Sequence, residues 1–359
     1  MHACIAKKQR GGGVVRYRIP MSWARAGLVL AREQDGPGSE VLGDPSIVWD
    51  EEIGSWRMFL FMAPPGHGQA VSDGTAAGPG AWRLLGPLRF TNPDCLLGGH
   101  THKPYIVMEA GAANRAAYAG GRFWLLLVSS PGGKVVQRAW AERLAGPWTV
   151  EPGPLIPAGP GDAFDAKHTD AVSGLYFPDR SAFLYFYMGY PRSAQPGRQS
   201  PFGSAQGVAV QRLGEPLARK LGVVLPPAPQ ARHWAGGWVG GMQVLPGDPD
   251  RWIAVVNASP TAPDPADAAI SREEPPPSLG GFAVTDEEWP VSGWRWAPSP
   301  IEWIEDIPAQ ARAAGEGVNL WRQHLLALPD GRLALLYNSG PYGREQLYMK
   351  VSAEVVRVP

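Results

Sequence analysis

Hydrophobic residues in this chain come in short runs of five or six, and Gly, Pro, Asn or Asp separate the runs. The 3.6-residue spacing of apolar positions that marks an amphipathic helix is nearly absent. Short apolar runs bounded by turn residues are typical of β-strands. The pattern therefore predicts an all-β chain.

One apolar run recurs five times along the sequence. Its copies lie at residues 57–62, 123–128, 182–187, 252–256 and 333–337. A turn and another apolar segment precede each copy, which predicts a β-hairpin, and a third strand follows it. A fourth strand follows in every copy except the last. Residues 23–29, near the start of the chain, have the form of this missing strand.

A four-stranded antiparallel unit repeated five times predicts a five-bladed β-propeller, in which the N-terminal strand closes the last blade. Such closure removes the free sheet edges that promote aggregation. The whole chain, residues 1–359, then forms a single domain. We expect the blades at residues 44–90, 100–157, 165–225, 233–303 and 316–359, the last together with residues 14–30.

Composition and charge exclude several other classes of protein. With 44% apolar and 18% charged residues, the chain has enough material for a buried core and too little charge for a disordered one. A formal net charge of zero gives no attraction for nucleic acid or a membrane surface. No apolar run approaches the roughly 18 residues of a transmembrane helix. We therefore expect neither nucleic acid nor a membrane as a partner.

The N-terminal sequence and the cysteines bear on location. Residues 1–18 contain basic residues but no apolar stretch behind them, so no secretory signal is visible. Only Cys4 and Cys95 are present, which is too few for a disulfide framework. We expect a cytoplasmic protein, with secretion left open for a trimmed N-terminus.

The order of the strands predicts where a site would lie. If each blade runs outward from the axis as an up-and-down meander, the starts of the inner strands share one face with the loops between second and third strands. Two long loops of this kind, residues 189–206 and 257–280, would border that face, although the second could equally be an ordinary surface loop. Polar residues open several inner strands, and Asp170 in the third aligns with Asp44 in the first.

Residues 44–48, Asp-Pro-Ser-Ile-Val, open the first inner strand, and Gly-Pro-Trp or Gly-Pro-Leu steps recur along the chain. This combination resembles the five-bladed glycoside hydrolases of family 43, and also those of families 32, 117 and 130. The resemblance implies an enzyme that hydrolyses a glycosidic bond in an axial funnel with a pair of acidic residues. It implies that Asp44 is the general base or nucleophile, and we expect inversion at the anomeric carbon.

A glycosidase also needs a group that gives its proton to the leaving oxygen. The families that the sequence resembles place a glutamate near the start of the third blade, and this sequence has none there. The polar run at residues 162–172 supplies three candidates instead, with Glu316 as a reserve. These candidates are Asp170, Asp165 and His168.

Other polar and aromatic residues fall on the same predicted face. The expected substrate-binding residues are His102, Lys103, Lys167, Trp238, Asn319 and Arg322, and Trp234 is a further candidate for stacking on a sugar. The cations among them would hold a carboxylate, sulfate or phosphate on the substrate, or would pair with the acids of the site.

No cofactor is required for this chemistry. The resemblance nevertheless implies a structural calcium or sodium ion in the central channel, for which His324 is a weak candidate ligand. His100 and His102 stand at alternate positions and would point to the same side of a strand, as metal ligands do. This spacing alone is a weak signal.

Two other functions stay open at this point. A glycoside phosphorylase or glycosyl transferase on the same scaffold would hold phosphate or an acceptor with His102, Lys103, Lys167 and Arg322. A non-catalytic carbohydrate-binding propeller would repeat its binding residues in every blade, whereas the polar residues here differ from blade to blade. This asymmetry favours one central catalytic site, with an oligosaccharide or glycoside as substrate.

Overall fold

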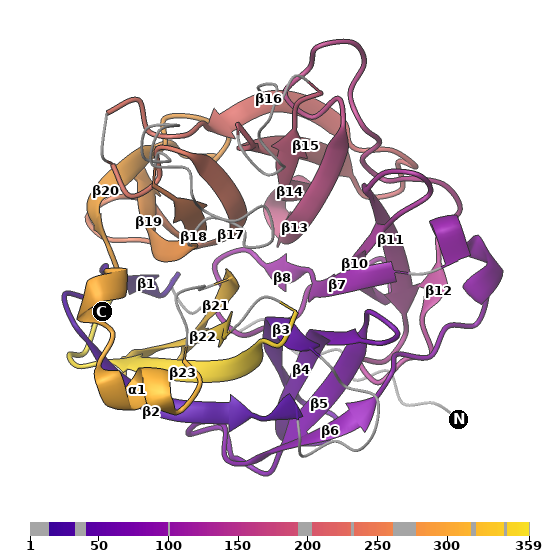
Figure 1. The fold of residues 1–359 in the computed structure, drawn as a ribbon. Helices are drawn as coiled ribbons and strands as arrows, with labels where there is room; N and C mark the ends of the chain where they lie inside the picture. The colour runs from indigo at the N-terminus through magenta and orange to yellow at the C-terminus, as the bar shows by residue number, and fades with distance from the viewer. Residues whose placement is uncertain are drawn as a thin grey trace.

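The computed structural model describes residues 14–32, 41–99, 101–192, 203–230, 233–260, 278–316, 321–340 and 343–358. Five antiparallel sheets are arranged as blades around a common axis, as Figure 1 shows. The prediction of an all-β, five-bladed propeller is therefore confirmed.

Each blade is built of four strands that follow one another outward from the axis. Blade one contains β3 (Val41–Asp50), β4 (Ser55–Ala63), β5 (Gly68–Ser72) and β6 (Trp82–Gly86). Blade two contains β7 (Thr101–Ile106), β10 (Arg122–Ser129), β11 (Val135–Ala141) and β12 (Thr149–Val150). Blade three contains β13 (His168–Phe177), β14 (Ala182–Tyr190), β15 (Ala205–Arg212) and β16 (Arg219–Leu225).

The last two blades follow the same order. Blade four contains β17 (Trp238–Pro246), β18 (Trp252–Ser259), β19 (Leu279–Thr285) and β20 (Arg295–Pro300). Blade five contains β21 (Trp321–Ala327), β22 (Leu333–Ser339), β23 (Gln346–Ser352) and β2 (Trp23–Leu30). Two short strands extend the sheets, because β9 (Tyr118–Ala119) pairs with β10 and β8 (Met108–Glu109) pairs in parallel with β13.

The N-terminal strand closes the ring, as the sequence predicts. β2 pairs antiparallel with β23, with Arg25 opposite Lys350 and Leu28 opposite Tyr348. The two ends of the chain also meet, since β1 (Arg16–Tyr17) pairs with β24 (Arg357–Val358). The N-terminal strand thereby joins the last blade, and β23 is paired on both sides, with β22 and with β2.

The hydrophobic core lies between neighbouring blades. Trp148 of blade two packs edge-on against Phe59 of blade one, with ring centroids 5.7 Å apart. Every residue of β14 is buried. Strands covered on both faces carry apolar residues at successive positions, which explains the continuous runs that mark the repeats.

Helical structure is sparse. The helix α1 (Ala309–Ala313) links blade four to blade five, and short 3-10 turns occur at Pro93–Cys95, Leu97–Gly99, Pro178–Arg180 and Ile304–Asp306. Within the described residues, no helix has the length and apolar character needed to cross a membrane. The central parts of the two predicted long loops, residues 193–202 and 261–277, lie outside the described residues.

Candidate active site

All five inner strands are interrupted by a β-bulge close to their starts. In four strands two residues stand opposite one residue of the neighbouring strand: 44–45 in β3, 103–104 in β7, 171–172 in β13 and 240–241 in β17. In β21 the inserted residue is 322. A bulge bends its strand and re-aims the side chains at that point. The repeated bulge brings Asp44, Lys103, Ala171 and Arg322 into the lining of one pocket, and in blade four the equivalent residue is Gly240.

The bulges correct the sequence alignment of the strand starts. The register places Ala171, and not Asp170, at the position of Asp44. In blades four and five the matching residues are Gly240 and Arg322, and not Trp238 and Asn319 as the apolar pattern predicts. An inserted residue leaves no mark in the apolar pattern, so the alignment from sequence is wrong by one residue or more in blades three, four and five, and right for Lys103 in blade two.

Backbone strain marks the same level of the propeller. Asp44, Lys103 and Ala171 have φ angles of 48°, 52° and 41°, in the left-handed region that residues other than glycine rarely occupy. Such conformations cost about 1–3 kcal/mol each and cluster at functional sites. In blade four the residue equivalent to Asp44 is Gly240, where a Cβ atom would collide with the side chain of Asn257.

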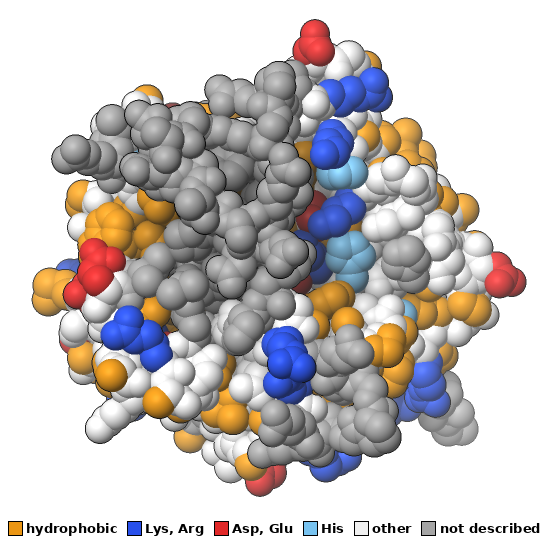
Figure 2. Space-filling view, viewed as in Figure 1, with side chains coloured by type: hydrophobic (Ala, Val, Ile, Leu, Met, Phe, Trp, Pro, Cys, Tyr) orange, Lys and Arg blue, Asp and Glu red, His pale blue; other side chains and the backbone are white. Residues whose placement is uncertain are grey.

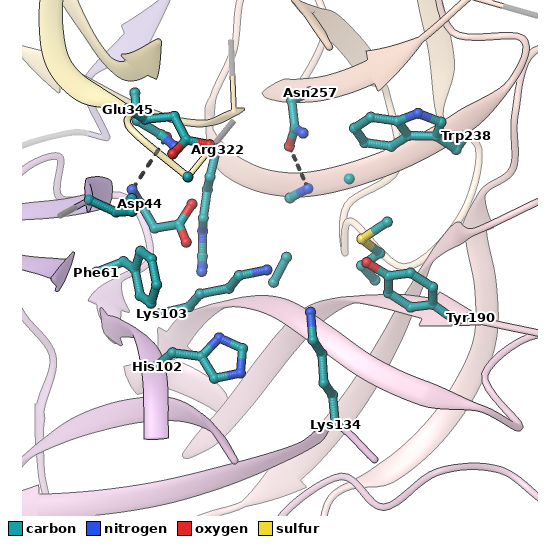
Figure 3. A pocket seen from close by; sticks show the side chains of 17 residues that line it. Asp44, Phe61, His102, Lys103, Lys134, Tyr190, Trp238, Asn257, Arg322 and Glu345 are labelled. Atoms are coloured by element: carbon teal, nitrogen blue, oxygen red, sulfur yellow. Dashed lines mark hydrogen bonds between the residues drawn. The ribbon is translucent and has the colours of Figure 1, made fainter. Parts of the chain in front are cut away.

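A pocket of about 460 Å³ opens at these strand starts. On the face drawn in Figure 2, Lys, Arg and His side chains gather in a hollow near its centre, and Figure 3 shows the pocket itself. Its volume is in the range of small-molecule sites. The polar and aromatic side chains that line it are Asp44, Phe61, His102, Lys103, Lys134, Tyr190, Trp238, Asn257, Arg322, Asn338 and Glu345.

Asp44 lies in the pocket wall on β3 and is 6% exposed. Its backbone N–H donates to the Oδ1 atom of Asn338 at 3.3 Å, which fixes the bulge against blade five. Burial raises the pKa of the Asp44 carboxyl, although the charges of Lys103 and Arg322 oppose the rise. A carboxylate with a raised pKa is a stronger base than an ordinary aspartate.

Asp170 is buried beneath the pocket and bound by two lysines. Lys103 Nζ lies 3.0 Å from both carboxylate oxygens, and Lys134 Nζ lies 2.6 Å from Oδ2. The Tyr190 hydroxyl and the N–H of Ala171 donate further bonds. Burial alone would raise the pKa of Asp170, but the two lysines outweigh it and hold the pKa well below its usual range. Asp170 is therefore ionised at neutral pH and has no proton to donate.

Glu345 lies just before β23 and is 4% exposed. Its carbonyl accepts a hydrogen bond from the N–H of Leu42 at 3.1 Å, which ties this part of blade five to blade one. Its Oε2 atom has no hydrogen-bond partner among the described residues. Burial, and secondarily the charge of Asp44, raise the pKa of Glu345 to about 7. This carboxyl group can therefore hold a proton near neutral pH.

Arg322 reaches into the pocket from the bulge of β21 and is 4% exposed. One of its nitrogens, Nη2, donates to the carbonyl of Val172, and the guanidinium lies 4.8 Å from the ring centroid of Tyr105. The other terminal nitrogen, Nη1, has no hydrogen-bond partner in the described part of the chain. The missing Cβ of Gly241 leaves room for the arginine, because that atom would lie 3.1 Å from Arg322 Cγ.

The predicted site residues thus divide into two groups. Asp44, His102, Lys103, Trp238 and Arg322 line the pocket, and Asp170 lies behind its lysines. His168, Asp165 and Lys167 do not line it, and Asn319 and His100 are outside the described residues.

The residues left out of the pocket have other contacts. Asp165 is buried, and its carboxylate accepts hydrogen bonds from the Tyr187 hydroxyl and from Lys220 Nζ. His168 Nδ1 accepts a bond from the backbone N–H of Lys134 at 3.0 Å. Lys167 is exposed.

Two further candidates belong to the interior. Trp234 is fully buried and donates through Nε1 to the carbonyl of Ala297, so it offers no face for sugar stacking. Glu316 is 4% exposed and accepts bonds from Arg25 and from the Tyr337 hydroxyl, away from the pocket.

His324 is fully buried behind the site. Its Nε2 atom lies 3.1 Å from the carbonyl of Ile47, and burial lowers its pKa to about 3, so the ring is neutral. Across the described ranges, no group of three or more His, Cys, Asp and Glu side chains is placed to hold a metal ion.

Sequence reasoning missed Lys134 and Glu345. Each directly precedes the third strand of its blade, β11 in one case and β23 in the other. The loops between second and third strands are predicted to share the face of the site, so these positions carry a usable signal. Both residues lie in short loops, which are less conspicuous in the sequence than the two long ones.

No family model matches the chain, and no curated protein matches it by sequence. Solved structures match it by fold. A BT0996 RGII complex has a TM-score of 0.65 at 14% identity over 96% of this chain and 94% of that one. A thermostable family-43 glycoside hydrolase has a TM-score of 0.58 at 13% identity over 90% and 97% of the two chains.

The catalytic domain of the Coprinopsis cinerea GH62 alpha-L-arabinofuranosidase is also similar, with a TM-score of 0.60 at 12% identity over 93% of this chain and 98% of that one. At such identities the likeness shows a common fold. The chain therefore has the fold of the propeller glycoside hydrolases that its sequence motifs resemble.

Proposed function

We propose that this protein hydrolyses a glycosidic bond in the axial pocket, with Glu345 as the proton donor and Asp44 as the base. The observation that carries the proposal is a pair of carboxyl groups in one pocket, one of which has a pKa raised to about 7. Glycoside hydrolysis needs one protonated and one ionised carboxyl group on either side of the bond. The shared fold with glycoside hydrolases supports the same chemistry.

In the proposed reaction, Glu345 gives its proton to the leaving oxygen as the glycosidic bond breaks. Asp44 takes a proton from the water whose oxygen attacks the anomeric carbon from the opposite face. This course inverts the anomeric configuration. Each turnover leaves Glu345 ionised and Asp44 protonated, and proton exchange with solvent restores both.

Asp170 acts in this proposal as a positioning residue. Its carboxylate holds Lys103 and Lys134 at the pocket wall. Both lysines contribute to the electrostatic field around Asp44, and Lys103 lowers the pKa of its carboxyl. This field opposes the rise in the pKa of Asp44 that burial causes.

A panel of aryl glycosides tests the proposal, with furanosides included because one structural neighbour is named an alpha-L-arabinofuranosidase. We expect one glycoside to be turned over and Asp44→Asn to lower kcat/KM by about 10²–10⁴-fold. We expect Glu345→Gln to cause a loss of that size for leaving groups that need a proton to depart. The matched control is Glu109→Gln, a carboxylate paired with Arg115 outside the pocket, which should retain activity. Full activity of either pocket variant would overturn the assignment.

A further inference from the structure

Arg322 differs from the other buried cations of the molecule. In the described residues, three other Arg or Lys side chains are buried to a similar degree, and each has a carboxylate partner. The pairs are Arg57 with Asp50 at 2.8 Å, Arg138 with Glu151 at 2.7 Å and Lys350 with Glu302 at 2.5 Å. Arg322 has no salt bridge in this part of the chain and leaves Nη1 without a hydrogen bond. A buried charge without a partner is costly, so its retention calls for a reason.

The direction of the side chain supplies that reason. Figure 3 shows the end of Arg322 pointing into the space between Asp44 and Lys103. Lys103 and Lys134 belong to the same pocket, with side chains 22% and 33% exposed. Three cations therefore face two carboxylates, Asp44 and Asp170, when Glu345 holds its proton. The pocket carries a positive excess that a bound anion would neutralise.

We propose that Arg322 forms an oxyanion subsite in the pocket, with Lys103 and Lys134 adding to its positive field. The ligand is a carboxylate on an acidic sugar or an inorganic phosphate, since both present paired oxygens to the fork of a guanidinium. The inference rests on the proposed function, because the anion belongs to the substrate or takes the place of water. With phosphate, its oxygen bonds to the anomeric carbon as the glycosidic bond breaks, and the leaving oxygen takes the proton of Glu345.

Direct binding measurements by calorimetry test the subsite without any need for turnover. The probes are glucuronate and galacturonate, the neutral sugars glucose and galactose, and inorganic phosphate, all at the same ionic strength. We expect at least one oxyanion to bind at millimolar concentrations, with affinity that falls as salt is added. Phosphate binding alone would identify phosphate as the ligand, and preference for a uronate over its neutral sugar would identify a carboxylate.

The variant Arg322→Met should weaken oxyanion binding by about 10–100-fold, the worth of a charge-assisted hydrogen-bonded contact. The control Arg332→Met removes an exposed arginine that is paired with Asp330 and should leave binding unchanged. A second variant, Arg322→Lys, keeps the charge but loses the fork, and we expect a smaller loss. It provides the test if the methionine variant does not fold.

Three results would overturn the subsite: no oxyanion binds, acidic and neutral sugars bind equally while phosphate does not bind, or oxyanion binding survives the loss of Arg322. Failure of the proposed function looks different. If Asp44→Asn and Glu345→Gln keep full activity while Arg322→Met loses oxyanion binding, the catalytic assignment is wrong and the subsite stands.

Discussion

Two of the buried charge clusters in the described residues are built differently. In blade five, Arg25 and Lys350 both contact Glu302, and Arg25 also bonds to Glu316. The Tyr337 hydroxyl completes this cluster by donating to Glu316 at 2.5 Å. Each of these charges has a partner of opposite sign.

The pocket contains a mixture of paired and unpaired groups. Asp170 is bound by two lysines, but Arg322 and Glu345 each keep a buried polar atom with no hydrogen bond in the described residues. The blade-five cluster fastens the N-terminal strand to the last blade, which is a structural task that complete pairing serves. The unpaired groups of the pocket reduce stability and are available to a ligand.

The largest effect on stability is expected from Lys350→Met. The side chain of Lys350 is 2% exposed and bonds to Glu302 at 2.5 Å, so its removal leaves a buried carboxylate with one partner fewer. Breaking a buried ion pair costs about 3–5 kcal/mol of unfolding free energy. Denaturant unfolding measures the loss, and Arg332→Met on the exposed pair with Asp330 should change stability by less than about 1 kcal/mol. If both variants changed the unfolding free energy by the same small amount, the blade-five cluster would have no special role in stability.

Asp170→Asn should lower activity by about 10²-fold, because Lys103 and Lys134 lose the carboxylate that positions them. The pH profile of kcat/KM separates this role from that of a proton donor. If Glu345 is the acid, the alkaline limb of the profile persists in the variant. Loss of that limb would indicate that Asp170 is the proton donor.

Glu345→Gln should stabilise the free protein in a pH-dependent manner. The pKa of Glu345 is raised to about 7 in the folded state, above its usual value of 4.5, so the folded protein loses stability as the pH rises from 4.5 through 7. The variant has no charge to bury. We expect its unfolding free energy to match that of the original protein near pH 4 and to exceed it by about 1–3 kcal/mol near pH 8. An excess that is the same at both pH values would contradict the raised pKa.

The smallest effect is expected from Arg322→Met in the absence of ligand. Replacing an unpaired buried cation with an apolar side chain of similar length should leave the unfolding free energy unchanged or raise it by about 1 kcal/mol. The melting temperature should change in the same direction. Arg138→Met, which removes an arginine bonded to Glu151 and Gln211, should lower it. Destabilisation of equal size by both would show that Arg322 is a structural cation like Arg138.

The fold was predictable from the sequence because it repeats. Five copies of one apolar run, and a matching strand at residues 23–29, specify both the number of blades and the closing pair β2 and β23. Asp44 was found because a short motif marks it. These signals are local and need no knowledge of how the blades meet.

His102, Lys103, Trp238 and Arg322 were also predicted and line the pocket, but the roles of Asp170 and Glu345 depend on contacts between blades. Asp170 and Asp44 look equivalent in sequence, and only the bulges show that Ala171 holds the equivalent position. The raised pKa of Glu345 comes from burial and from Asp44, a residue about 300 positions away along the chain. Glu345 follows a charged neighbour, Arg344, in a loop and so has the appearance of an ordinary surface residue.

The dependence of Glu345→Gln on the leaving group tests the central claim most directly. For the glycoside that the panel identifies, kcat/KM is measured for a series from alkyl to dinitrophenyl leaving groups in the original protein and the variant. A dinitrophenolate departs without a proton, so the account predicts a loss of less than about tenfold there and a loss of about 10³-fold for the alkyl glycoside. Equal losses across the series, or no loss at all, would contradict Glu345 as the proton donor.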